Sequence, residues 1–217
     1  ADGYRETCQA YAREDNPLFV PESAPFGSNA WNMFYALANY GAIGYALFGI
    51  EHILDASGEV NPMAQPLVES FRCAAAAVPL LLTYQGTDRI YAVVQQDHQI
   101  NQHYDFEGWV GLVQFGYGTY QFLGMDWRHP PRRWPMMADP DQPRGRGLIF
   151  QADENTFYLV GGAYRLHLRR KGDPKEMLDA TMVSSYHQMR QARYVAVDEG
   201  HFDEEGRFVV DRRCNGD

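Results

Sequence analysis

The chain has 217 residues, of which 45% are hydrophobic and 14% aromatic, and its formal net charge is -9. This length and composition suffice for one large hydrophobic core or two smaller ones, and they exclude a disordered chain. An acidic chain without a long basic stripe also argues against nucleic acids and anionic membranes as partners, and it leaves uncharged substrates such as sugars open.

The first 85 residues are predicted to alternate helices and short strands. Apolar residues at helical spacing predict a helix that begins near Asp2 and ends before Asn16 and Pro17. A second helix begins at Ser28 or Asn29, and a third opens at residues 61–62 and ends between 79 and 86.

Two apolar runs in this part have the length of strands. Residues 18–20 are flanked by prolines, which cannot donate to a sheet, so the hydrogen-bonded part of this strand must be very short. Residues 42–48 show no polar alternation and are predicted to form a strand buried on both faces, as in a parallel sheet covered by helices. This order of elements indicates an α/β layer.

The pattern changes after residue 86, where short β-rich runs are separated by glycine and aspartate turns. We predict strands or hairpin arms at 89–95, 109–115, 118–123, 147–151, 156–160, 164–169, 194–197 and 207–210. In 164–169 apolar and charged residues alternate, which predicts one face in water. The Pro- and Arg-rich residues 125–147 are interpreted as an ordered binding loop or a mobile one, and 173–193 as helical. The second half is therefore predicted to be an antiparallel sandwich or sheet module.

Several site motifs are missing or weak. The chain has no phosphate-binding glycine loop and no GxSxG elbow. Its three cysteines, Cys8, Cys73 and Cys214, indicate no disulfide framework, and Cys73 is interpreted as a small core residue. The cluster of Asp97, His98, His103 and Asp105 has a spacing that fits neither one face of a helix nor one face of a strand. We interpret its histidines as solvated loop residues and expect no metal and no cofactor.

Two carboxylates follow the predicted strands of the first part. Glu22 follows the run 18–20 after Pro21, and Glu51 comes just after the run 42–48. A carboxylate where a buried strand opens into a loop is held by the sheet and exposed at its rim, which is where barrel enzymes keep their chemistry. The alternatives are a solvated glutamate in a Pro-rich turn for Glu22 and a helix cap or loop charge for Glu51.

NPLFVPE (16–22) followed by YGAIGYALFGIE (40–51) resembles the last two strand segments of the barrel in glycoside hydrolase family 35, the β-galactosidases. GRGLIFQADENTFYLVGG (145–162) and VDEGHFDEEGRFVVDRRCNGD (197–217) resemble the β-rich domain that some members carry after the barrel. The resemblance implies the last strands and helices of a (β/α)8 TIM barrel in residues 1–85 and an antiparallel β-sandwich-like domain in residues 86–217.

The resemblance also implies a retaining mechanism on terminal β-galactosides of poly- or oligosaccharides. Glu22 stands at the position of the family's nucleophile, and Phe48 and Glu51 are expected to line the sugar site. After Glu22 the sequence continues with SAPFG (23–27) instead of the usual Arg- or Gly-containing loop, so the sugar pocket is expected to differ. The family analogy favours a periplasmic or secreted enzyme.

A complete barrel needs eight strands and about 250 residues, and this chain supplies only two such strands. The acid/base glutamate of the family comes from an earlier strand, so we expect a fragment that needs the remainder of the barrel from its parent chain and is inactive alone. The apolar stretch 74–82 is too short to span a bilayer and is interrupted by Pro79. No signal peptide is visible, and the start at Ala1 is interpreted as a processing site or a cut.

One rival interpretation is a non-catalytic carbohydrate-binding or structural β-module, in which Tyr104, Trp109, Tyr117 and Trp127 form a platform for sugar stacking. Core packing is the competing use of these aromatic residues. Another possibility is that a separate polypeptide supplies the rest of the barrel.

Overall fold

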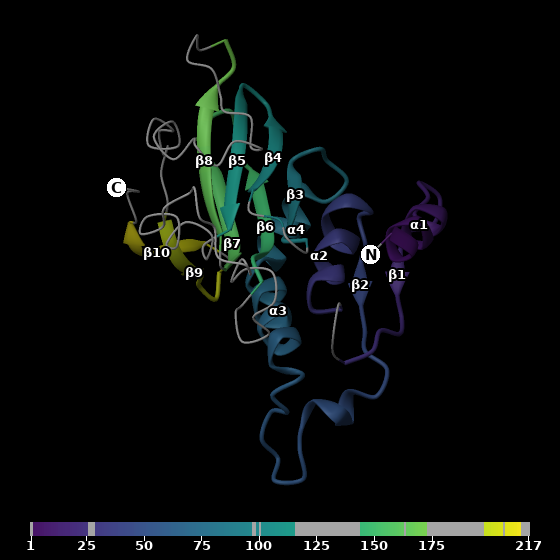
Figure 1. The fold of residues 1–217 in the computed structure, drawn as a ribbon. Coiled ribbons are helices and arrows are strands. Elements are labelled where there is room, and N and C mark those ends of the chain that lie inside the picture. Colours follow the sequence, from purple (N-terminus) through teal and green to yellow (C-terminus); the bar gives the residue numbers. More distant parts are fainter. Residues whose placement is uncertain are drawn as a thin grey trace, which may run out of the picture.

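The structure is a computed structural model that describes residues 2–25, 29–96, 99, 101–115, 144–162, 164–172, 198–205 and 207–213. Within these ranges the protein is a mixed α/β fold with several antiparallel sheets, and most strands lie in the C-terminal half (Figure 1). The predicted strands 118–123 and 194–197, the predicted helix 173–193 and most of the connection 125–147 lie outside the described residues.

The N-terminal part contains one parallel strand pair. Helix α1 (Asp2–Tyr11) ends before Pro17, and strand β1 (Phe19–Val20) follows. Helix α2 (Asn29–Asn39) then leads to strand β2 (Gly44–Tyr45), which pairs in parallel with β1, with Phe19 opposite Gly44. A helix between two parallel strands is the expected crossover, because parallel neighbours cannot be joined by a tight turn.

The second strand is shorter and more exposed than its sequence predicts. Only two residues of the run 42–48 form β2, and the side chains of Ile43 and Phe48 are 62% and 69% exposed. The expectation of a strand buried on both faces is therefore wrong for the described chain. Continuous apolar sequence predicts burial only where a covering layer exists, and the described elements leave Ile43 and Phe48 largely exposed.

The third predicted helix is divided in two. A 3-10 helix, η1 (Ile50–Ile53), precedes α3 (Gln65–Ala76), and α4 (Val78–Tyr84) follows at an angle of 58°. Pro79 in the first turn of α4 explains the break, since proline lacks the N–H that a continuous helix would need. Among the described residues no single helix is long and apolar enough to span a membrane, although the bent pair α3–α4 passes on length and composition together.

The second half forms antiparallel sheets, as predicted. One sheet has the order β3 (Ile90–Val94), β6 (Arg146–Gln151), β7 (Phe157–Gly162). Another has the order β4 (Asn101–Phe106), β5 (Trp109–Phe115), β8 (Tyr164–Arg170). Strands β9 (Asp198–Phe202) and β10 (Phe208–Arg213) form a separate antiparallel hairpin. The predicted strands at 89–95, 109–115, 147–151, 156–160 and 164–169 are confirmed, whereas β4 was not predicted.

Two hydrophobic clusters lie on the opposite faces of the sheet β3–β6–β7. On one face, buried residues of α2 and α4 pack against alternate residues of β3 and β6. On the other face, Val93 and Ile149 pack against buried residues of β4, β5 and β8. All six residues of β6 are consequently buried, because β6 is the central strand of its sheet and this sheet lies between the helices and the sheet β4–β5–β8 (Figure 1).

Candidate functional site

Glu22 lies two residues after the end of β1, where the chain leaves the parallel pair. Its side chain is exposed and lines a cavity of about 610 Å³ between α1 and residues 16–24. It makes no hydrogen bond or ion pair with any residue that the structure describes. Within the described part of the chain, the carboxylate is therefore exposed and not engaged in an internal contact.

Main-chain hydrogen bonds join β1 and the loop that follows it to the segment that contains β2. Main-chain hydrogen bonds of 2.8 Å join Ile43 N to Leu18 O and Ala46 N to Val20 O. A third, of 2.9 Å, joins Phe48 N to Ser23 O, one residue beyond Glu22. The structure thus brings Phe48 next to the loop of Glu22, at the carboxyl ends of both strands.

Glu51 stands further along, in the first turn of η1. Its side chain is exposed, and Oε1 lies 4.0 Å from Nε2 of His52. Of the three predicted site residues, only Glu22 is among the described residues that line the cavity. Phe48 and Glu51 are placed near the same strand ends but not on the wall of this cavity.

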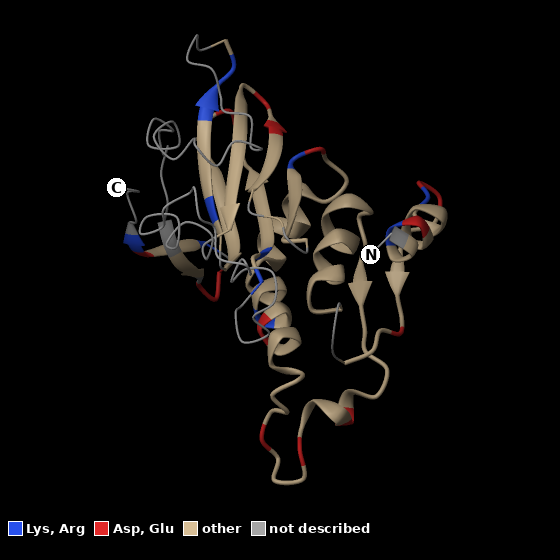
Figure 2. Cartoon of the chain, in the orientation of Figure 1, with Lys and Arg blue, Asp and Glu red and all other residues tan. Residues whose placement is uncertain are grey.

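The loops at these strand ends are acidic. The sequence contains no lysine or arginine between Arg13 and Arg72, while seven carboxylates, among them Glu22 and Glu51, fall in this interval (Figure 2). A binding site built from these loops would repel an anionic ligand, so it suits neutral molecules such as sugars.

The sequence did not reveal the polar residues beneath this loop. Asn29, the first residue of α2, donates from Nδ2 to the carbonyl of Ala24 over 3.0 Å, and its Oδ1 lies 3.5 Å from the hydroxyl of Tyr45. Burial is the main cause that raises the pKa of Tyr45 and of Tyr4, whose ring reaches the same region from α1. Asn29 was predicted only as a helix cap, and the contacts it makes across the chain leave no signal in local sequence.

The aromatic residues proposed as a sugar platform are used in packing where they are described. Tyr104 donates its hydroxyl to Ala92 O over 2.8 Å and stacks on Phe106. Trp109 is only 8% exposed, and the guanidinium of Arg170 covers its ring at 4.6 Å. Tyr117 and Trp127 lie outside the described residues. Core packing is therefore the observed role of the two described aromatics.

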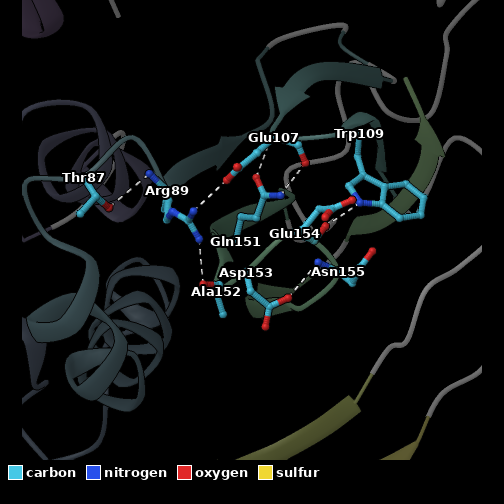
Figure 3. Close-up of polar contacts among 9 residues, drawn as sticks. All are labelled: Thr87, Arg89, Glu107, Trp109, Gln151, Ala152, Asp153, Glu154 and Asn155. Atoms are coloured by element: carbon cyan, nitrogen blue, oxygen red, sulfur yellow. Dashed lines mark hydrogen bonds and ion pairs between the residues drawn. The ribbon is translucent and has the colours of Figure 1, made fainter. Parts of the chain in front are cut away.

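A polar network joins the turn between β4 and β5 to the turn between β6 and β7 (Figure 3). The amide of Gln151 accepts from Glu107 N and donates to Glu107 O, both over 2.8 Å. Trp109 Nε1 donates to Glu154 O over 2.6 Å. Arg89 joins the carboxylate of Glu107 at 2.7 Å and the carbonyl of Ala152 at 2.9 Å. These partners are all used internally, so the network is structural.

The structure describes two of the four residues in the predicted histidine and aspartate cluster. His103 and Asp105 lie on strand β4 instead of a loop, and Asp105 pairs with Lys171 at 2.6 Å. Asp97 and His98 lie outside the described residues. Among the residues that are described, no group of three or more potential ligands is close enough to hold a metal ion.

Two cysteines fall in the described ranges, and both are free thiols. Cys73 lies in α3 and packs at the edge of the helix–sheet cluster, where burial raises its pKa to about 11. A thiol with a raised pKa is a weak nucleophile at neutral pH. Cys73 is half-buried and packs against the core cluster without belonging to its buried residues.

Fold and site together define a mixed α/β protein whose C-terminal half consists mostly of antiparallel strands. Residues 67–217 match a domain of unknown function, DUF5597, and the chain belongs to this family. The matched region begins in α3, so it follows Glu22, Phe48 and Glu51 along the chain. No curated protein matches the sequence.

Proposed function

We propose that this chain is the C-terminal part of a retaining exo-β-galactosidase of glycoside hydrolase family 35. The observation that carries the proposal is the position of Glu22, an exposed carboxylate without an ion pair among the described residues, at the carboxyl end of a strand and on the wall of a cavity. Its substrates are terminal β-galactosides of poly- or oligosaccharides.

In this mechanism the Glu22 carboxylate attacks the anomeric carbon, and the glycosidic oxygen leaves with a proton from a second carboxylic acid. The glycosyl ester formed on Glu22 is then hydrolysed by water, which the second residue deprotonates. Retaining enzymes hold the two carboxyl groups about 5 Å apart. The second group is proposed to come from an earlier strand, outside this chain.

The geometry of β1 supports the idea that further strands complete a barrel. Among the described strands β1 pairs only with β2, and the cavity beside Glu22 runs along residues 16–24. An open strand edge is a site for pairing with another strand. The remainder of the barrel is proposed to come from the parent chain, or from a separate polypeptide that would copurify with this one. On this proposal the two sheets that share a core form the appended sandwich-like domain.

An assay on an aryl β-galactoside tests the catalytic role. The isolated 217 residues should show no turnover above buffer, because half of the carboxylate pair is missing. In the longer polypeptide encoded by the same reading frame, Glu22→Gln should lower kcat about a thousandfold or more. Glu14→Gln, at an exposed position between α1 and β1, serves as the matched control.

Two results would overturn the proposal. Turnover by the isolated chain that is lost in Glu22→Gln would show that no external acid is needed. Full activity of the longer polypeptide carrying Glu22→Gln would remove the nucleophile.

A second candidate is a non-catalytic carbohydrate-binding or structural β-module. It is favoured by the family match, which covers the β-rich part and leaves out Glu22. In that case the whole chain should bind galactose-containing glycans equally well with and without Glu22→Gln, and the longer polypeptide should hydrolyse none of them.

A further inference from the structure

We propose that Asn29 is a positioning residue for Glu22, holding the loop that carries this carboxylate through the carbonyl of Ala24. The inference rests on the proposed function, because positioning matters only if Glu22 must present its oxygen atoms to a reacting carbon. It assigns a role to the polar residues beneath the loop, which the catalytic proposal leaves unused.

The loop needs such a tie because its own strand is very short. β1 has two residues, and the prolines at 17 and 21 contribute no N–H group to any ladder. Among the described residues beyond Val20, one main-chain hydrogen bond, Phe48 N to Ser23 O, joins the loop to the neighbouring strand segment, and the Ser23 side chain also bonds to Tyr45. The Asn29 amide adds the next bond, at 3.0 Å to Ala24 O, two residues after Glu22.

The orientation of the Asn29 amide follows from its partners. Oδ1 receives Asn32 Nδ2 at 3.3 Å and the Tyr45 hydroxyl at 3.5 Å, so the oxygen faces the body of α2 and β2. Nδ2 is therefore directed at the loop, where Ala24 O can only accept. One side chain thus connects the start of a buried helix, strand β2 and the loop of Glu22.

The hydrogen bonds from Phe48 and from Asn29 hold two neighbouring residues of the short segment 23–25. Ser23 is buried and bonded through its carbonyl, Ala24 is bonded through its carbonyl, and Pro25 is buried. Glu22 is the exposed residue at the head of this fixed segment. Loss of the Asn29 bond should let the segment move while the core that contains α2 stays intact.

Amide hydrogen exchange on the 217-residue chain tests the tie directly. Asn29→Asp keeps the acceptor oxygen and the shape of the side chain but replaces the donor with a carboxylate that repels Ala24 O. An aspartate at a helix N-terminus does not destabilise the helix, so overall stability should not fall. We expect the Phe48 amide to exchange about tenfold faster, with the Ile43 and Ala46 amides unchanged.

Asn39→Asp is the matched control, because it makes the same change at an exposed position at the other end of α2. It should leave the Phe48 amide as it is. Tyr45→Phe removes one of the groups that orient Asn29 and should accelerate exchange at Phe48 to a smaller extent. Unchanged exchange in Asn29→Asp, or equal acceleration at Ile43 with a lower denaturation midpoint, would overturn the proposal.

Kinetics of the longer polypeptide test the link to Glu22. Asn29→Asp should lower kcat on an aryl β-galactoside at least tenfold and leave KM within about twofold, as expected when a group is misplaced for the reaction but substrate binding remains. Faster exchange with an unchanged kcat would overturn the positioning role. If Glu22→Gln itself leaves activity intact, the proposed function is wrong, and the positioning role of Asn29 is wrong with it. Loss of activity in Glu22→Gln together with an unchanged kcat in Asn29→Asp would contradict the positioning role alone.

Discussion

At the scale of single residues, His167 shows how the fold changes the chemistry of a side chain. The alternation in 164–169 predicts that His167 faces water, but on β8 it is only 7% exposed. Burial lowers its pKa to about 4, and the charge of Arg165 on the same strand acts in the same direction. The described neighbour across the sheet is Leu112 of β5, which brings no charge.

This pKa makes the stability of the protein dependent on pH. Between about pH 6.5 and pH 4 the unfolded chain binds a proton at His167 that the folded chain does not bind, so the free energy of unfolding should fall as the pH falls through this range. The loss should reach about 3 kcal/mol at the acid end. Denaturant unfolding at a series of pH values measures it.

His167→Gln should flatten this dependence, because it removes the titrating group. His103→Gln is the matched control, since His103 is exposed on the outer strand β4 in register with the same row of the sheet. A pH dependence that is equally steep in wild type and His167→Gln would contradict the assignment.

At the scale of elements, the turns between strands are held by buried side-chain amides. Gln151 is 1% exposed and satisfies both the N–H and the C=O of Glu107, in the turn between β4 and β5 (Figure 3). The two sheets are consequently joined by polar contacts at their ends as well as by the hydrophobic cluster between them.

Gln151→Met should destabilise the protein by about 2 kcal/mol, because it preserves the size of the side chain and leaves two main-chain groups without their partner. Thermal and denaturant unfolding measure the change. Gln9→Met, at an exposed position on α1, should have little effect. Equal stabilities of the two variants would show that water replaces the amide at no cost.

A second tie joins the helices to the sheets. The side chain of Arg146 on β6 is 10% exposed, and it donates to Ser70 Oγ over 2.8 Å, to Pro66 O over 3.0 Å and to Glu69 over 2.7 Å. All three partners belong to α3. Planar guanidinium groups suit such multiple contacts, so this arginine fixes the angle at which α3 meets the sheet.

At the scale of the whole molecule, the region matched by the family does not contain a complete core. Helix α2 precedes residue 67, yet its buried residues Met33, Phe34, Tyr35 and Leu37 cover the face of β3 and β6. A chain that starts at residue 67 would expose that apolar face of the sheet.

We therefore expect residues 67–217 to aggregate or to lack fixed packing, whereas residues 29–217 should remain folded and monodisperse, because large exposed apolar patches drive association. Size-exclusion chromatography, near-ultraviolet circular dichroism and dye binding to apolar surface distinguish the two. A cooperative unfolding transition for 67–217 with the stability of the whole chain would show that α2 is dispensable.

Much of the fold could be read from local sequence. Gly41 follows the end of α2, and runs of β-branched and aromatic residues predicted strands such as β3 and β5, whereas α1 ends at Tyr11, well before the predicted stop at Pro17. Strand β4 was not predicted because its sequence, NQHYDF, is polar at most positions. It is a strand because β5 offers a complete edge for it to pair with, register for register.

The candidate site divides in the same way. Sequence alone placed Glu22 after a strand and before a Pro-rich loop, because the local dihedral preferences of proline and the length of an apolar run act within a few residues. The cavity beside Glu22, the bond from Asn29 to its loop and the burial of His167 were decided only by tertiary structure. Each depends on the packing of segments that lie far apart in the chain. The free energy of this packing depends on the surfaces that the segments bury together, so it cannot be predicted from the order of neighbouring residues.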